Sequence, residues 1–309
     1  MKSKIQPKFF LIQNIVIALT QKQILLFLLT LILFSSCETV TEIDFPEEKP
    51  QLVINAIFNA DSLVKVDLTE SQPVNNKSLN FKLVENASIE ILKNTVSLGF
   101  LHYKGKGKYL SESKLPDEPN AVYSLKIKAT GFETAEAAEP IPAKPMLNSM
   151  KVKADGQNNG AGYKSYKVDF NLNDSQEDNF YFLRVWLVNP THKSPVYFRL
   201  YNDVGQFVPF GVAGSEMIVF DDQTFNGREV GFNLDLIQAY TLGGNGIRIQ
   251  IELGSTNKSY YDYQFSLRKQ IQGDPILNSS DYPVSSNIKN GLGIFAPYNA
   301  ATFSFNVTR

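Results

Sequence analysis

The sequence predicts a mainly β protein with two β-sandwich domains, and three observations support this expectation. Apolar and polar residues alternate with a period of two in many short runs, such as Val64–Thr69 (VKVDLT) and Tyr123–Thr130 (YSLKIKAT). Glycine-rich turns separate the runs, as in Lys104–Gly107 (KGKG) and Gly243–Gly246 (GGNG). The chain also contains 22 Phe and 14 Tyr, residue types that favour strands. Alternation buries one face of each strand, and short strands with frequent turns are typical of antiparallel sandwiches.

Residues 1–36 are expected to be a lipoprotein signal peptide. A segment containing four lysines and no acidic residue is followed by the eleven-residue apolar run Ile24–Phe34 (ILLFLLTLILF) and then by Ser35 and Ser36. A helix needs about 20 apolar residues to cross the hydrocarbon of a bilayer, so this run is too short for a typical spanning segment. The order of basic, apolar and small residues is instead that of a cleaved secretory signal.

Cys37 is the only cysteine and the expected site of lipid attachment. The small residues before it resemble the lipobox of bacterial lipoproteins, in which the signal is cut before the cysteine and the cysteine is acylated. An acylated sulfur cannot form unwanted disulfides, which fits the absence of a second cysteine in an exported chain. The alternative is a buried thiol at the end of a membrane helix.

The remaining chain is expected to form a tether and two folded domains. Residues 37–50 comprise the lipidated Cys and a disordered acidic tether with five acidic residues and two prolines. Residues 51–142 are predicted to form an immunoglobulin- or transthyretin-like sandwich, and residues 146–309 a second, larger β domain. The boundary is placed in Glu139–Pro145, where three prolines interrupt strand pairing.

One helix is expected, over Ser259–Gln272. Its apolar residues fit both a strand and a helical stripe formed by Tyr260, Tyr263, Leu267 and Ile271. The capping residues Ser255–Asn257 precede it and Gly273–Pro275 follows it, so the helix is favoured.

Composition argues against several function classes. Acidic residues outnumber basic ones once the lysine-rich N-terminus is set aside, whereas binding to nucleic acid needs clustered Lys and Arg. His102 and His192 lie in different predicted domains and have no Cys or His at metal-ligand spacing. No Gly-x-Ser-x-Gly motif or phosphate-binding loop is present. We therefore expect no catalytic residue, no metal and no cofactor.

Carboxylates are the remaining material for catalysis. Asp221 and Asp222 follow an apolar run and could lie at a strand end, with Asp203, Asp235 or Glu252 as a distant partner. A glycoside hydrolase needs two such groups about 5–10 Å apart. The favoured alternative is a turn in which the aspartates accept local backbone hydrogen bonds. The oxygen-rich loop with Asn171, Asn173, Asp174, Glu177 and Asp178 could bind calcium, but it lacks the full calcium-loop order, so a solvated loop is favoured.

Aromatic residues provide further binding candidates. Phe180–Leu187 is apolar on both faces, which predicts a central strand, and Trp186 is expected in the core rather than as a sugar-stacking platform. Aromatic residues also surround residues 202–206 and could line a recognition surface. The candidate ligand-binding residues are Tyr197, Tyr201, Phe207, Phe210, Asp221 and Asp222.

Several motifs together resemble the domain-of-unknown-function family DUF4249. They are Gln51–Ile54, Ser71–Val74, Tyr123–Leu125 with Gly131 and Phe132, Asn179–Val185, Phe220–Asp222, Tyr260–Tyr263 and, most specifically, Ser286–Phe295 (SNIKNGLGIF). The resemblance covers nearly the whole mature chain. It implies an outer-membrane lipoprotein on the periplasmic or extracellular face, with a TonB-dependent outer-membrane transporter as a possible partner. It implies no catalytic residues.

Three functions remain open at this point. The favoured one is a lipid-anchored, non-enzymatic surface module that binds a ligand or docks on a transporter. The second is a carboxylate-dependent glycan hydrolase, which predicts paired carboxylates in a cleft. The third is a structural or adhesive envelope lipoprotein, which predicts flat contact surfaces without a pocket.

Overall fold

The computed structural model describes residues 49–73, 80–155, 165–201, 207–209, 216–236, 247–272 and 282–306. The predicted signal peptide, Cys37, almost all of the predicted tether and Phe210 lie outside these ranges. The described residues belong to one compact unit and are mainly β, as the sequence predicts. Among the helices in these ranges, none has the length and hydropathy that crossing a bilayer would require.

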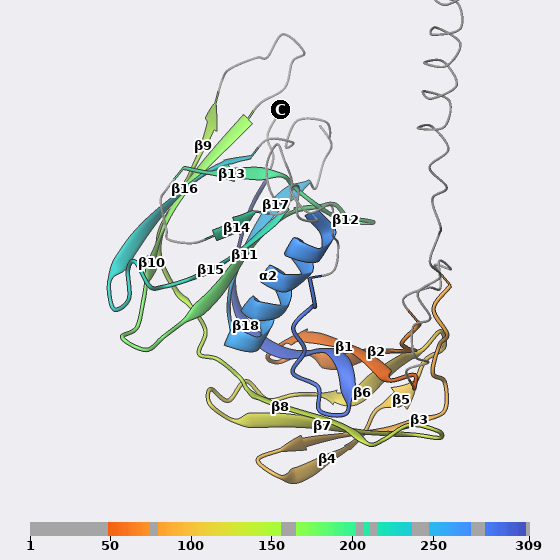
Figure 1. The fold of residues 1–309 in the computed structure, drawn as a ribbon. Coiled ribbons are helices and arrows are strands. Elements are labelled where there is room, and N and C mark those ends of the chain that lie inside the picture. Colours follow the sequence, from red (N-terminus) through yellow and green to blue (C-terminus); the bar gives the residue numbers. More distant parts are fainter. Residues whose placement is uncertain are drawn as a thin grey trace, which may run out of the picture. The chain divides into compact units, whose positions relative to one another are not determined.

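The N-terminal half contains two packed sheets (Figure 1). Their shared core includes Val64, Val66 and Leu68 of one sheet and Tyr123 and Leu125 of the other, all almost fully buried. These are the alternating positions identified in the sequence, so the period of two does mark the buried face. The strands are β1 (Leu52–Asn59), β2 (Leu63–Glu70), β6 (Lys108–Lys114) and β5 (His102–Tyr103) in one sheet, and β4 (Val96–Phe100), β3 (Ala87–Lys93), β7 (Val122–Ala129) and β8 (Ala135–Pro140) in the other.

The C-terminal half encloses a second apolar core between two further layers. One layer continues the sheet of β1, β2, β6 and β5, and the other is a four-stranded sheet. The first contains β18 (Gly291–Asn306), β17 (Arg248–Thr256), β11 (Phe180–Val188), β15 (Met217–Asp221), β14 (Phe207–Pro209) and β12 (Lys193–Pro195), and the second β13 (Phe198–Leu200), β16 (Glu229–Leu236), β10 (Ser165–Asn173) and β9 (Met146–Asp155).

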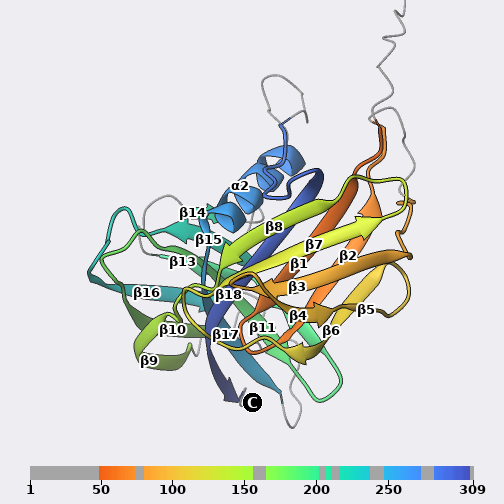
Figure 2. The ribbon, with the colours of Figure 1, turned by 90° about the horizontal axis from the view of Figure 1, so that it is seen from below.

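Strand β18 joins the two halves (Figure 2). Its first part pairs in parallel with β1, and its second part pairs antiparallel with β17. Gly293 makes the parallel contact possible, because its φ is +105° and a Cβ there would lie 2.0 Å from the carbonyl oxygen of Ile54. Only glycine tolerates both conditions. This strand runs across both halves, and the N-terminal core also includes Ile288 and Phe295 from the C-terminal part of the chain.

Helix α2 (Lys258–Gln272) confirms the predicted helix and packs beside β18, β15 and β11 (Figure 1). Tyr260 is buried in a small cluster with Phe182 and Val219. The backbone carbonyl of Asn257 accepts the amides of Tyr260 and Tyr261 at 3.1 and 3.2 Å. Its side-chain amide donates to the Pro140 carbonyl oxygen at 3.0 Å, so it ties the helix start to the end of β8 instead of capping the helix.

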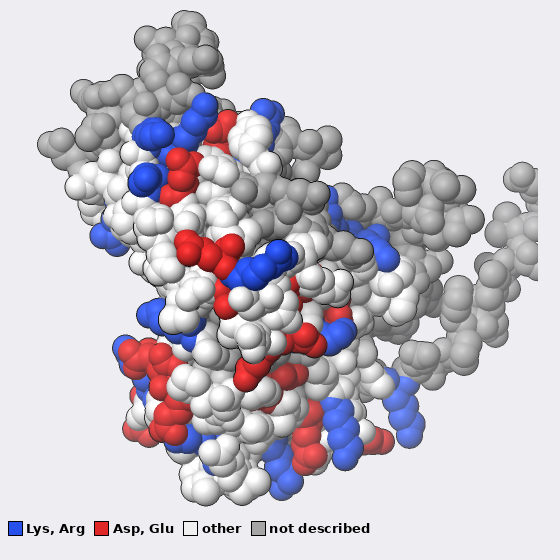
Figure 3. Space-filling view, turned by 90° about the vertical axis from the view of Figure 1, so that its left-hand side faces the viewer, with Lys and Arg blue, Asp and Glu red and all other residues white. Residues whose placement is uncertain are grey.

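Charged side chains are mixed on the face shown in Figure 3. Lys and Arg lie among Asp and Glu there, and no extended basic patch is seen among the described residues of this face. Mixed charge of this kind offers little attraction for a phosphate backbone.

Candidate functional site

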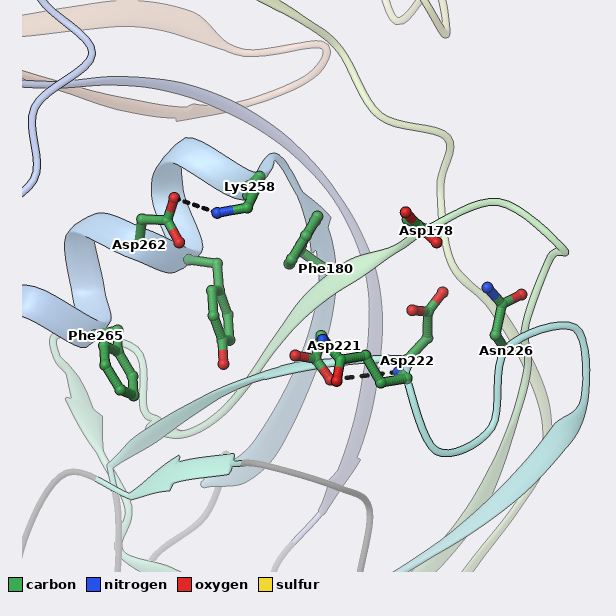
Figure 4. A pocket seen from close by; sticks show the side chains of 10 residues that line it. Asp178, Phe180, Asp221, Asp222, Asn226, Lys258, Asp262 and Phe265 are labelled. Carbon is green, nitrogen blue, oxygen red and sulfur yellow. Dashed lines mark hydrogen bonds and ion pairs between the residues drawn. The ribbon is translucent and has the colours of Figure 1, made fainter.

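A cavity of about 700 Å³ opens where β11, β15 and the first turns of α2 meet (Figure 4). Its size is within the usual range for small-molecule sites. Phe180 and Asp221 are paired residues on the adjacent strands β11 and β15, so their side chains share one sheet face. The lining residues are Asp178, Phe180, Asp221, Asp222, Gln223, Asn226, Lys258, Tyr261, Asp262 and Phe265.

One wall of the cavity is aromatic. The ring centroids of Phe180 and Tyr261 are 5.4 Å apart, and those of Tyr261 and Phe265 are 6.2 Å apart. Tyr261 and Phe265 lie four residues apart on α2, a spacing that places both rings on the same helix face. The three half-buried rings therefore form a row that continues from the strand onto the helix.

Asp221 contributes a carboxylate to the cavity lining beside Phe180. The residue is only 6% exposed. The backbone N–H of Gln223 donates to its Oδ1 over 3.3 Å, and Oδ2 receives no hydrogen bond from any described residue. Burial raises the pKa of this carboxyl, the Gln223 amide partly opposes that change, and the nearby charge of Asp222 adds to it.

Asp222 is engaged in the local structure. Its Oδ2 accepts the backbone N–H of Asn179 at 2.7 Å and the side-chain amide at 3.3 Å, and its carbonyl oxygen accepts the N–H of Phe225 at 2.8 Å. These contacts hold the turn after β15 against the start of β11. Asp222 thus has the local role that the turn interpretation gives to both aspartates.

The helix side of the cavity holds an ion pair. Lys258 Nζ lies 2.6 Å from Asp262 Oδ2, one turn along α2. Figure 4 shows this pair across the cavity from Asp178 and Asp222. Since Lys258 is the only cation among the lining residues, and it already has a carboxylate partner, the lining carries a net negative charge.

The family of the chain follows from a comparison with family models. Residues 38–304 match the model described as Domain of unknown function (DUF4249). The chain belongs to this family. No curated protein matches the sequence. Among solved structures, the chain is similar to the Fcho1 Mu homology domain of Danio rerio with bound Eps15 peptide, at 10% identity and a TM-score of 0.21, over 81% of this chain and 92% of that one. A likeness at that TM-score carries no argument.

The most specific block of this DUF4249 chain, Ser286–Phe295, has a structural role away from the cavity. The Asn287 side chain donates to Glu139 Oε1 and to the Phe295 carbonyl oxygen, each at 2.8 Å, and accepts the Phe295 N–H at 2.9 Å. The Asn290 amide donates to the Thr134 carbonyl oxygen at 3.1 Å. The block therefore fixes the start of β18 against β8, and it contains Gly293.

A second polar cluster lies on the face of β11 that α2 partly covers. Arg184 Nε and Nη2 each donate to Glu252 at 2.8 Å, Trp186 Nε1 donates to the same carboxylate at 3.0 Å, and Tyr298 Oη accepts from Arg184 at 2.8 Å. Burial alone raises the pKa of Glu252, but the hydrogen bonds and charge of Arg184 lower it below the ordinary value. This cluster is a satisfied ion pair, and Glu252 does not line the cavity.

Trp186 is half-buried above this ion pair. Its indole N–H is committed to Glu252, and the ammonium of Lys193 lies 4.6 Å from the ring centroid. Strand β11 is paired on both sides, by β15 and β17, as its two-sided apolar pattern predicts. The Trp186 ring therefore packs against Arg184 and Lys193, and its N–H binds Glu252.

The six predicted binding residues do not form one site, since only Asp221 and Asp222 of those described line the cavity. Asp221 and Asp222 line the cavity, but Tyr201 is 63% exposed and donates to Asp235 at 2.7 Å beside β16. Tyr197 is half-buried, and a hydrogen bond to Glu216 raises the pKa of its hydroxyl. Phe207 lies in β14 opposite Phe220, and Phe210 lies outside the described residues, as does Asp203.

The loop weighed as a calcium site is held by internal hydrogen bonds. The carboxylate of Asp174 accepts the hydroxyl of Tyr181 and, at 2.9 Å, the N–H of Gly227. Within the described ranges, no group of three or more His, Cys, Asp or Glu residues has an arrangement suited to a metal ion. Asp174 thus connects the end of β10 and the start of β11 with the turn before β16.

Sequence reasoning did not identify the aromatic wall. The sequence predicts only that Phe180 lies in a strand and that Tyr261 and Phe265 lie in a helix, because nothing local indicates that this helix packs against β11 and β15. A signal was present in the helix itself: Lys258, Tyr261, Asp262 and Phe265 share one face at helical spacing. That face mixes charge with aromatic surface and so differs from the buried stripe.

Proposed function

We propose that this protein is a lipid-anchored surface protein whose folded part binds a small ligand in the cavity between β11, β15 and α2, without catalysing a reaction. The observation that carries the proposal is the cavity, in which a row of three rings lies beside the carboxylate of Asp221, which accepts one hydrogen bond, from the Gln223 amide. Apolar surface with a few placed polar groups is typical of ligand sites.

The proposed location is the outer membrane, on its periplasmic or extracellular face. It rests on the apolar run, the small residues and the single cysteine at position 37, together with the lipoprotein character implied by the family resemblance. The same resemblance suggests a TonB-dependent outer-membrane transporter as the partner. In this arrangement the anchored protein would hold a ligand near the transporter that takes it up.

The anchor is tested by metabolic labelling with an alkyne analogue of palmitate. Wild-type protein should incorporate the label and stay in the membrane fraction, whereas Cys37→Ser should lose the label and accumulate with its signal peptide uncut. An equally labelled Cys37→Ser variant would contradict the anchor. Affinity capture of detergent-extracted wild-type protein should recover a TonB-dependent transporter, and its absence from cross-linked samples would contradict the partnership.

A glycan hydrolase is the second candidate, and one observation favours it. Asp221 has little exposure and shares the cavity with Asp178 and Asp222, so the cavity lining supplies more than one carboxyl, as a glycoside hydrolase requires. Incubation with a panel of oligosaccharides tests this candidate. Turnover by wild-type protein that Asp221→Asn abolishes would establish it and exclude a purely binding role.

A further inference from the structure

The charge of the cavity lining is not balanced within the protein. The lining includes four aspartates and one lysine, and the lysine forms its ion pair with Asp262. No described Lys or Arg forms an ion pair with Asp178, Asp221 or Asp222. Asp178 is exposed and solvated, and Asp222 accepts two hydrogen bonds from Asn179. Asp221 therefore has little solvent exposure, no ion pair with a described residue and only one hydrogen bond, from the Gln223 amide.

Asp221 is the carboxylate of the cavity that accepts the fewest hydrogen bonds for its low exposure. It is more than nine-tenths buried, it lines the cavity, and its Oδ2 receives no hydrogen bond from any described residue. Asp221 accepts one hydrogen bond, from the Gln223 amide, whereas carboxylates with so little exposure normally pair with a cation or accept several hydrogen bonds. A ligand that brings a positive donor to this oxygen would supply the missing partner.

The aromatic wall adds the other half of the recognition surface. Because Phe180 is paired with Asp221 across adjacent strands, its ring lies beside the carboxylate, and Tyr261 and Phe265 extend the row onto the helix. Tyr261 is also close enough to Asp221 for the carboxylate charge to contribute to the raised pKa of its hydroxyl. Ring faces attract cations and also pack against apolar groups.

We propose that the cavity binds an organic cation, meaning a protonated amine or guanidinium group attached to an apolar or aromatic body. The cationic group pairs with Asp221, and the attached body packs along Phe180, Tyr261 and Phe265. This inference rests on the proposed binding function and names its ligand class. A neutral sugar would leave the negative charge of the lining uncompensated, and an anion would be repelled by it.

The test uses three probes of nearly identical shape and different charge: benzamidine, benzamide and benzoate. Each is titrated calorimetrically into full-length, detergent-extracted protein at neutral pH. We expect benzamidine to bind at least about tenfold more tightly than benzamide, since a charge-assisted contact is stronger than a neutral one. Benzoate should give no binding heat. Equal affinities for benzamidine and benzamide would overturn the inference.

Substitutions then locate the site. Asp221→Asn keeps the shape and removes the charge, so benzamidine should bind about tenfold more weakly. Asp61→Asn is the matched control, because this exposed turn residue has φ +55°, which Asn also tolerates, and it does not line the cavity. Equal weakening by both variants, or by neither, would contradict the proposed site.

Lys258→Gln tests whether the negative charge of the cavity lining strengthens the binding of a cation, and it leaves Asp221 and the three rings unchanged. The lysine side chain is 68% exposed, so the variant should fold normally. Removing the only cation of the lining should tighten benzamidine binding by about threefold, an effect that added salt should reduce. Unchanged or weaker binding by Lys258→Gln would contradict an electrostatic role of the cavity, even if Asp221→Asn failed to fold.

Two further experiments, a maltoheptaose titration and a Ca²⁺ competition, separate this inference from the proposed function. If maltoheptaose binds wild-type protein and not Asp221→Asn, while benzamidine does not bind, the ligand class is wrong and the binding function stands. If Ca²⁺ displaces benzamidine at equal concentration, the site prefers an inorganic ion and the inference is also wrong. Failure of the Cys37 labelling would contradict the anchored function whatever the probes show.

Discussion

Two buried carboxylates on either side of β11 have opposite surroundings. Glu252 lies on β17 and accepts hydrogen bonds from both Arg184 and Trp186, while Asp221 lies on β15 and accepts one long bond from a backbone amide. Both are less than a tenth exposed. The pKa of Glu252 is lowered and the pKa of Asp221 is raised. A carboxylate is thus fully hydrogen-bonded by side chains in one place and accepts a single backbone hydrogen bond in the other.

The largest expected change in stability comes from removing Arg184 from its ion pair with Glu252. Arg184→Leu leaves Glu252 buried without its cation, and we expect the free energy of unfolding to fall by about 3–5 kcal/mol in urea titrations. Lys126→Ala is the control, because its pair with Glu136 is much more exposed and should cost about 1 kcal/mol or less. Similar losses in the two variants would mean that burial does not distinguish these pairs.

A smaller change removes one donor to Glu252. Trp186→Phe keeps most of the aromatic surface but loses the indole N–H that donates to Glu252 at 3.0 Å. We expect unfolding to become easier by about 1 kcal/mol, measured by the same urea titration. The loss should vanish in an Arg184→Leu/Glu252→Leu background, where no carboxylate remains to accept the bond. A loss that persists there would show that ring packing is responsible.

Asp221→Asn should raise stability, in contrast to Arg184→Leu and Trp186→Phe, and its effect should depend on pH. The folded chain keeps the Asp221 proton to a higher pH than the unfolded chain, whose ordinary value is 3.8, so wild-type stability falls as pH rises through this window. The Asn variant lacks this penalty and should be more stable at neutral pH, by about 1 kcal/mol or less. Thermal unfolding at several pH values measures the difference, which should disappear below pH 3.8.

For Glu252 the relation between pH and stability has the opposite sign, because its pKa is lowered in the folded chain. Its pKa in the folded chain is below the ordinary value of 4.5, so its contribution is complete above that value and is lost as pH falls through the folded pKa. Glu252→Gln should therefore lower stability at neutral pH and have progressively less effect in acid. Parallel pH profiles for Glu252→Gln and Asp221→Asn would falsify the contrast between the two sites.

The smallest effect is expected at the exposed ion pair of the cavity. Lys258→Gln removes a pair whose side chains are 68% and 40% exposed, so the stability change should stay within about 0.5 kcal/mol. The same variant is expected to change ligand binding. A stability loss well above this limit in thermal unfolding would indicate that the pair helps to hold α2 on the sheet.

Local patterns predicted much of the secondary structure. Alternation identified the inward residues of β2, β7 and β17, and the capping and stop residues identified α2, because these signals depend on neighbours in the chain. Of the six predicted binding residues, the two aspartates at the end of β15 line the cavity. The division into domains at residues 142–146 remains a prediction.

The pairing of β1 with β18 could not be read from the chain in this way. These strands are more than 230 residues apart in the sequence, and their parallel register depends on the close approach of Gly293 to Ile54. Likewise, the row formed by Phe180, Tyr261 and Phe265 exists only because α2 packs against β11 and β15. Such contacts depend on many weak interactions at once, so no single local motif specifies them.

The sequence by itself determined the β-rich class, helix α2 and the family, since periodicity, turn residues and motif order are properties of the chain. Tertiary structure alone decided which carboxylates are satisfied. Glu252 and Asp221 both lie in strands next to β11, but only Glu252 has Arg184 beside it on the paired strand. Electrostatic environment depends on distances in space and on the exclusion of water, and both are set when the sheets and the helix pack together.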